Sequence, residues 1–253
     1  KILIWYGRVD EVAAILTALI GPRADGRDGT DHLSLAAYWI AFICPPVGER
    51  LLPPVDTLGP PKGAERTVWA NCVRNLQRIR SGGPHAEIID SAERILRTCP
   101  LSEQTFDISV SALLALLYVD SNDRAEFWCE ALLADAVRRR ARAWEAMFGA
   151  IYAMILVRRG DLPRAARQAR GVYELFSPRG WGAAIGLPLA VRVAAATRLG
   201  RYDEAAALLR LPVPPSTFQT QFGLFYLYER GVYHLATDRI AAAIADFGRC
   251  GEL

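Results

Sequence analysis

Apolar residues recur along this chain at intervals of three and four positions, which places them on one face of an α-helix. Leu187, Val191 and Ala194 follow this spacing, and the pattern stops at Gly200. Repeated along the chain, it predicts an all-α fold without strands. The expected helices cover residues 9–20, 31–43, 64–81, 85–98, 103–119, 124–139, 142–158, 163–176, 182–199, 202–210, 217–236 and 239–250.

Similar turn sequences recur along the chain. LGRYDEAAALL at 199–209 repeats YGRVDEVAAIL at 6–16, and each joins an apolar helix to an Ala-rich one. Related turns are centred on Gly7, Gly83, Asn122, Gly160, Gly200 and Asp238, and the last five are 39, 38, 40 and 38 residues apart. A constant period is typical of stacked helical hairpins. We therefore expect a right-handed superhelical solenoid of tetratricopeptide-like helix-turn-helix repeats, with a period of about 38–40 residues.

The interval from Gly7 to Gly83 is 76 residues, twice the repeat, so one turn is missing near the Pro-rich stretch CPPVGERLLPPVDTLGPPKG. We expect one helical-repeat domain over residues 1–253, in which an irregular insertion at 44–63 replaces part of one repeat. The chain has no initiator Met and starts inside a predicted helix, so we expect it to be a fragment of a larger chain.

Composition excludes several classes of function. The 30 basic and 27 acidic residues give a formal charge of +3, too balanced to suggest a polyanion-binding surface over the whole molecule, so nucleic acid is not the expected partner. The longest apolar run, residues 146–157, is shorter than the roughly 20 residues of a membrane span. Five scattered cysteines without a CxxC pair predict neither disulfides nor zinc, and favour a reducing cytoplasmic compartment.

Motifs of catalysis and cofactor binding are missing from the sequence. It contains no GxxxxGK[ST] phosphate loop, GxSxG elbow, HExxH pair or GxGxxG fingerprint. We therefore assign no catalytic, cofactor-binding or metal-binding residue, and we expect the chain not to be an enzyme.

Candidate binding residues follow from the repeat. If the first helix of each hairpin faces a groove, the residues two positions before each turn form a ladder that includes Asp120, Arg158 and Arg198. Arg158 and Arg198 could hold a carboxylate of a ligand or of an acidic partner segment. Arginines in a last helical turn also compensate the helix dipole, which is the alternative interpretation.

Aromatic residues supply a second candidate. Phe222, Tyr226 and Tyr228 belong to a dense aromatic stripe in the last third of the chain. Such a stripe could line an apolar pocket for a small molecule or a peptide. It could equally pack between repeats.

The GRYDEA turn resembles the tetratricopeptide repeat, whose usual period is about 34 residues. A closer likeness runs collinearly through residues 123–253, in DRAEFWCEALLADAVRRRA, RGDLPRAARQAR, RGWGAAIGLPLA, LGRYDEAAALLRLPVP and FQTQFGLFYLYERGVYHLATDRIAAAIADFGRCGEL. These segments resemble the helical middle region of the large ATP-binding LuxR-type regulators of actinomycetes, which are similar in layout to the maltose-activator class of signal-transduction ATPases. The N-terminal third departs most from this pattern.

The resemblance implies a transcriptional activator, often of antibiotic biosynthesis, with an ATP-binding module and a DNA-binding helix-turn-helix on either side of the region. We therefore expect a non-catalytic sensor and scaffold that binds an effector or partner and couples it to these flanks. The alternative is a plain protein-interaction module that docks a peptide or a second copy. An enclosed apolar cavity with converging polar groups would favour the sensor, and an open charged groove would favour peptide docking.

Overall fold

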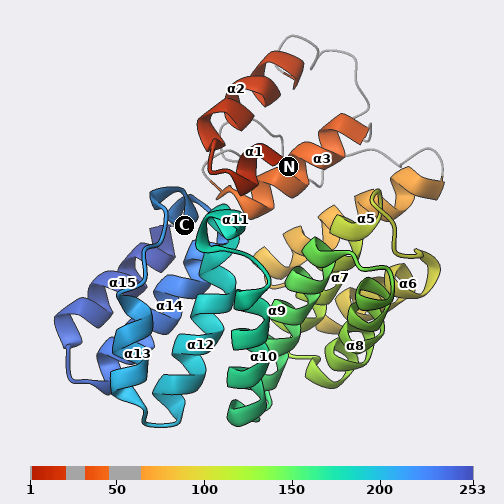
Figure 1. The fold of residues 1–253 in the computed structure, drawn as a ribbon. Helices are drawn as coiled ribbons and strands as arrows, with labels where there is room; N and C mark the ends of the chain where they lie inside the picture. Colours follow the sequence, from red (N-terminus) through yellow and green to blue (C-terminus); the bar gives the residue numbers. More distant parts are fainter. Residues whose placement is uncertain (1, 21–31, 46–63, 253) are drawn as a thin grey trace.

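The computed structural model describes residues 2–20, 32–45 and 64–252 (Figure 1). All regular secondary structure in these ranges is helical, so the all-α prediction is confirmed for the described part of the chain. The predicted insertion at 44–63 lies, from residue 46 onward, outside the described residues.

From residue 64 onward the described chain forms five helical hairpins, α5–α6, α7–α8, α9–α10, α12–α13 and α14–α15. Their bounds agree with the predicted helices to within a few residues: α5 (Ala64–Arg80), α6 (His85–Thr98), α7 (Phe106–Tyr118), α8 (Asn122–Arg138), α9 (Arg142–Arg158), α10 (Leu162–Glu174), α12 (Gly186–Arg198), α13 (Tyr202–Leu209), α14 (Gln221–Ala236) and α15 (Ile240–Glu252).

Shorter elements complete the fold. The N-terminal helices are α1 (Ile2–Trp5), α2 (Val9–Ile20) and α3 (His32–Ile43). One helical turn, α11 (Pro178–Trp181), and the 3₁₀ segments η3 (Gly182–Ile185) and η4 (Pro215–Gln219) lie in the connections around α12 and α14. The predicted ranges include α2 and α3, and the one-turn helix α1 lies at the start of the chain, which was also expected to be helical.

The hairpins pack in chain order. The first helices α5, α7, α9, α12 and α14 each contact the next one, and the second helices α6, α8, α10 and α13 contact the first helix of the following hairpin. Figure 1 shows the result as a row of hairpins running from α5 to α15. The three middle hairpins thus bury their apolar faces between the hairpin before and the hairpin after them.

The same turn ends the first helix of each of the five hairpins, and it also ends α1 and α8. At each, one residue adopts the left-handed conformation; its N–H donates to the carbonyl three residues earlier, and the next N–H donates to the carbonyl five residues before it. These two bonds define the Schellman motif that ends many helices. The left-handed residues of the described chain that share it are Gly7, Gly82, Asp120, Arg140, Gly160, Gly200 and Asp238.

Two of the predicted turn positions were wrong by one or two residues. The left-handed residue is Gly82 rather than Gly83, and Asp120 rather than Asn122, which instead begins α8. Aspartate tolerates this conformation better than most residues because its short side chain is polar. The two similar segments around Gly7 and Gly200 do form the same turn, in which these glycines have φ of 74° and 71°.

The N-terminal helices meet the last hairpins of the row. Besides its contacts with α2 and α5, α3 contacts α14, and α1 contacts η3 (Figure 1). Trp5 stacks on Trp181 with ring centroids 6.1 Å apart. The described helices at the start of the chain therefore lie against both ends of the row.

The inner helices form the core. α7, α9 and α12 are buried on nearly all sides, which explains why they are apolar all round rather than amphipathic. The stretch Pro178–Arg198 is the one described helix long and apolar enough to cross a membrane, and 83% of its most apolar window is buried inside the protein. Contacts of α12 with α9, α10, α13 and α14 use this apolar surface.

Candidate functional site

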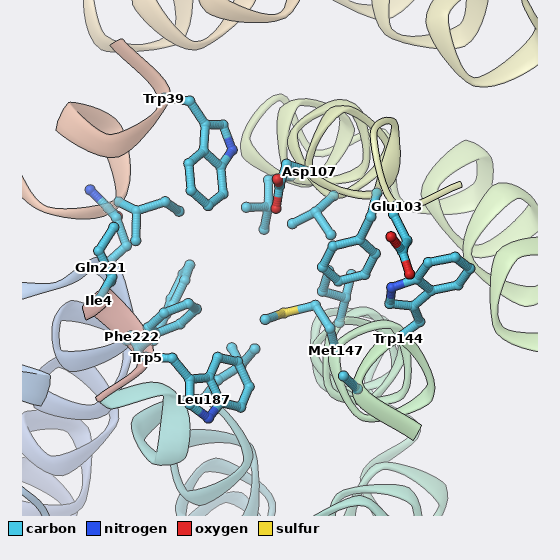
Figure 2. Close-up of a pocket in the computed structure, with 17 residues that line it drawn as sticks. Ile4, Trp5, Trp39, Glu103, Asp107, Trp144, Met147, Leu187, Gln221 and Phe222 are labelled. Atoms are coloured by element: carbon cyan, nitrogen blue, oxygen red, sulfur yellow. The ribbon is translucent and has the colours of Figure 1, made fainter. Parts of the chain in front are cut away.

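A partly enclosed cavity of about 290 Å³ lies where α1 and α3 face the inner helices α7, α9, α12 and α14 (Figure 2). All but three of its described lining side chains are apolar or aromatic. Met147 on α9 reaches toward the centre of the cavity, and Leu187 on α12 lies on its wall (Figure 2). The space is therefore suited to an apolar guest rather than to water.

Six aromatic side chains surround the cavity. Phe106 stacks on Trp144 with centroids 5.8 Å apart and planes 13° apart, and it meets Phe148 behind it edge to face. Phe225 stacks on Tyr118 at 6.3 Å. Packing against neighbouring rings restricts the movement of these walls. The six are Trp5, Trp39, Phe106, Trp144, Phe222 and Phe225.

The three polar lining residues are Glu103, Asp107 and Gln221. Asp107 is buried, with only 6% of its surface exposed, whereas Glu103 is exposed and lies beside Trp144 (Figure 2). The hydroxyl of Tyr118 donates to the Gln221 side chain at 3.3 Å. Three polar side chains thus line different sides of an otherwise apolar space.

Local sequence positions Glu103. Ser102 N–H donates to Thr105 Oγ1 at 2.8 Å, and Thr105 N–H donates to Ser102 Oγ at 3.2 Å. This reciprocal pair resembles a capping box and fixes the turn that precedes α7. The predicted helix at 103–119 therefore begins only at Phe106, and Glu103 lies in the turn before it.

Four of the predicted site residues come together in a separate groove of about 440 Å³, namely Asp120, Arg158, Arg198 and Tyr228. Both arginines are already engaged. Arg158 pairs with Asp120 at 2.8 Å and donates to the Leu117 carbonyl at the end of α7 at 2.6 Å. These contacts favour the helix-end interpretation of Arg158 over an open carboxylate clamp.

Arg198 makes two hydrogen bonds to Glu229 on α14, at 2.6 and 3.2 Å. Glu229 is only 14% exposed, and burial raises the pKa of its carboxyl although the Arg198 and Arg158 guanidinium groups oppose the shift. Sequence reasoning missed Glu229. The sequence could have indicated Glu229, because it is an acidic residue on the first helix of the hairpin that follows the one containing Arg198.

The aromatic stripe divides between different surroundings. Phe222 lines the apolar cavity and Tyr228 lines the groove. Tyr226 lines neither, contrary to the prediction: it is 2% exposed and packs against Phe218 and Arg230 in the interior. Tyr226 follows Phe225 by one position, so helical rotation turns it by about 100° from Phe225 and out of the cavity lining.

The walls contributed by Ile4, Trp5, Trp39 and Trp144 were not predicted as site residues. They belong to helices far apart in the sequence, and no local pattern indicated that they meet. Among the described residues, no group of three or more His, Cys, Asp or Glu side chains is arranged to hold a metal ion. Comparison of the chain with protein-family models, curated protein sequences and solved structures finds no match.

Proposed function

We propose that this chain is a non-catalytic sensor module that holds a small apolar effector in the cavity between its N-terminal helices and its inner helices. The observation that carries the proposal is the cavity itself. It combines a continuous apolar wall with three polar groups, which is the usual composition of a small-molecule site.

The proposal includes a right-handed superhelical solenoid of tetratricopeptide-like repeats. Two observations support it: the hairpins contact each other in chain order, and their turns share one hydrogen-bond pattern. The left-handed residues Gly82, Asp120, Gly160, Gly200 and Asp238 are 38, 40, 40 and 38 residues apart. Regular spacing of this kind is the expected signature of stacked repeats.

The cavity suggests how an effector would act. Its walls come from α1 and α3 on one side and from α7, α9, α12 and α14 on the other. A guest that contacts both sides stabilises the arrangement in which the N-terminal helices lie against the row. Binding would then shift the population toward that arrangement.

The wider setting rests on the resemblance of residues 123–253 to the LuxR-type regulators. In that setting the module belongs to a cytoplasmic activator of antibiotic biosynthesis genes. The arrangement in which the N-terminal helices lie against the row would then control a flanking ATPase and a flanking DNA-binding domain. ATP belongs to the flank in this proposal, and this chain makes no direct contact with nucleic acid.

Docking of a peptide or a second copy is the competing function, and its natural place is the groove of Asp120, Arg158 and Arg198. Both guanidinium groups there are already paired with carboxylates of the chain. A partner carboxylate would have to displace Asp120 or Glu229 first. We therefore favour the small-molecule site.

A cavity-filling variant tests the proposal. N-phenyl-1-naphthylamine, a neutral fluorescent probe of apolar sites, is expected to bind the wild-type chain saturably. Met147→Trp fills the cavity and is expected to weaken probe binding at least about tenfold. The matched control Met147→Leu keeps the volume and is expected to bind as the wild type does, at a stability cost below about 1.5 kcal/mol.

Thermal unfolding of each variant checks that it remains folded. Probe binding that is equally tight in Met147→Trp and in the wild type, with both proteins folded, would contradict the proposal. So would the absence of saturable binding to the wild-type chain.

A further inference from the structure

The charged residues that line the cavity are of one sign. Glu103 and Asp107 carry carboxylates, and no Arg, Lys or His is found among the described lining residues. The chain as a whole is nearly balanced in charge, with 30 Lys and Arg against 27 Asp and Glu. A lining whose charged residues are all acidic is therefore a local feature that composition does not account for.

From this we infer that the ligand of the cavity is an organic cation, an amine or a quaternary ammonium with an aromatic or other apolar body. The inference rests on the proposed small-molecule site and names the chemical class of its ligand. It excludes carboxylates, phosphates and sulfates, because the described lining offers no cationic partner for them.

Electrostatics supports a cation at this place. Glu103 is exposed and forms no ion pair with another described residue. Apolar walls lower the local dielectric constant, so the field of a carboxylate at the edge of a cavity reaches further than it does at an open surface. A cation is attracted by this field, and an anion is repelled.

Aromatic rings stand beside both carboxylates. Figure 2 shows Trp144 next to Glu103, and Trp39 on the side of the cavity where Asp107 lies. The indole N–H of Trp39 donates to Ser111 Oγ at 3.0 Å, and that hydroxyl donates to the backbone carbonyl oxygen of Asp107, one helical turn earlier, at 2.7 Å. The faces of Trp and Phe attract ammonium groups by about 0.5–2 kcal/mol, whereas they offer nothing to an anion.

The polar groove is a useful contrast. There Arg158 and Arg198 balance Asp120 and Glu229, so the groove has no net charge and only Phe225 lines both sites. Of these two sites, only the aromatic cavity is lined by charged residues of a single sign. A cation with an apolar body fits the cavity, and nothing comparable selects it in the groove.

Three probes of nearly equal shape test the inference by isothermal titration calorimetry. They are 1-naphthylmethylamine, which is protonated at neutral pH, the neutral 1-naphthalenemethanol and the anionic 1-naphthoate. We expect the amine to bind at least about tenfold more tightly than the alcohol, and naphthoate to show no detectable binding.

Glu103→Gln removes one charge at an exposed site and is expected to weaken amine binding about threefold to tenfold, while binding of the alcohol stays unchanged. Glu174→Gln makes the same change at an exposed position near the end of α10, away from the cavity lining, and is expected to leave both affinities unaltered.

The outcomes distinguish failure of the cation inference from failure of the proposed small-molecule site. Equal affinity for the amine and the alcohol, or tighter binding of naphthoate, would overturn the cation inference and leave the small-molecule site standing. An unchanged amine affinity in Glu103→Gln would remove the role given to Glu103. If none of the three probes binds the wild-type chain, the cation inference fails together with the cavity's function.

Discussion

The indole N–H of Trp5 donates a 2.7 Å hydrogen bond to the carbonyl oxygen of Gly180, which lies 175 positions later in the chain. The backbones of Trp5 and Gly182 also lie close together, because a Cβ added at Gly182 would lie 1.9 Å from the Trp5 carbonyl oxygen. Gly182 also has a φ of 53°. The N-terminal helices are thus fastened where only glycine fits.

Gly182→Ala tests this attachment. The methyl group cannot be accommodated without moving Trp5, so we expect a loss of about 2 kcal/mol or more in the free energy of unfolding. Hydrogen exchange should accelerate in α1–α3 more than in α9 or α12. Gly171→Ala is the control, because its Cβ meets open space within α10, and it is expected to stabilise the protein by about 0.5–1 kcal/mol. Similar losses in both variants would contradict the assignment.

The shared turn predicts opposite effects of opposite substitutions. Arg140 has a φ of 56° in the turn between α8 and α9, and Gly200 has a φ of 71° in the turn between α12 and α13. Arg140→Gly should raise the free energy of unfolding by about 1 kcal/mol, and Gly200→Ala should lower it by a similar amount, because a Cβ is strained in this conformation. Urea denaturation measures both. Changes of the same sign would count against a common turn geometry.

The Arg198–Glu229 pair predicts a pH dependence. Because burial raises the pKa of Glu229 above its ordinary value of 4.5, the folded protein binds this proton more tightly than the unfolded chain does. The resulting stability is present below that ordinary value and is lost as the pH rises through the folded pKa. The stability of the wild type relative to Glu229→Gln should therefore fall as the pH rises above this ordinary value.

Arg198→Met supplies the complementary measurement. Removing the guanidinium group takes away the contact that opposes the pKa rise, so the decline of stability with pH should become steeper. At pH 7 we expect a loss of about 2 kcal/mol, since Glu229 is left buried without its partner. Denaturation midpoints over the pH range decide the matter, and a wild-type profile that matches that of Glu229→Gln would refute the assignment.

Cysteine reactivity is a further test of the core. Burial raises the pKa of Cys44 to about 12, and it also raises the pKa of Cys72 and Cys129, so these thiols are both inaccessible and protonated at pH 8. Cys99 and Cys250 are only partly buried. Mass spectrometry after brief treatment with iodoacetamide should find these two labelled first. Labelling of Cys129 as fast as Cys99 would contradict the packing of α8 against α9.

The helices were predictable because the pattern that specifies them is local. Apolar spacing of 3.6 residues marks a helix whatever it packs against, and the predicted limits of α9 and α12 lie close to those observed. The turn after α7 shows the limit of this reasoning. Asp120 and Asn122 both suit a left-handed residue, and only the helix end at Tyr118 selects Asp120.

The candidate site was less predictable because its walls are formed by long-range contacts. The ladder correctly gathered Arg158 and Arg198 in one groove, but it could not indicate that Asp120 and Glu229 already neutralise them. The apolar cavity depends on Trp5 meeting Trp181, a contact that no spacing within a repeat encodes.

The bond between Trp5 and Gly180 also bears on the order of folding. Hairpins from α5 to α15 form from segments adjacent in the chain, so little entropy is lost in bringing them together, whereas the first helices must wait for a partner that is built much later. We therefore expect docking of α1 to be a late step in folding. Before that step the cavity would lack the wall that Ile4 and Trp5 provide.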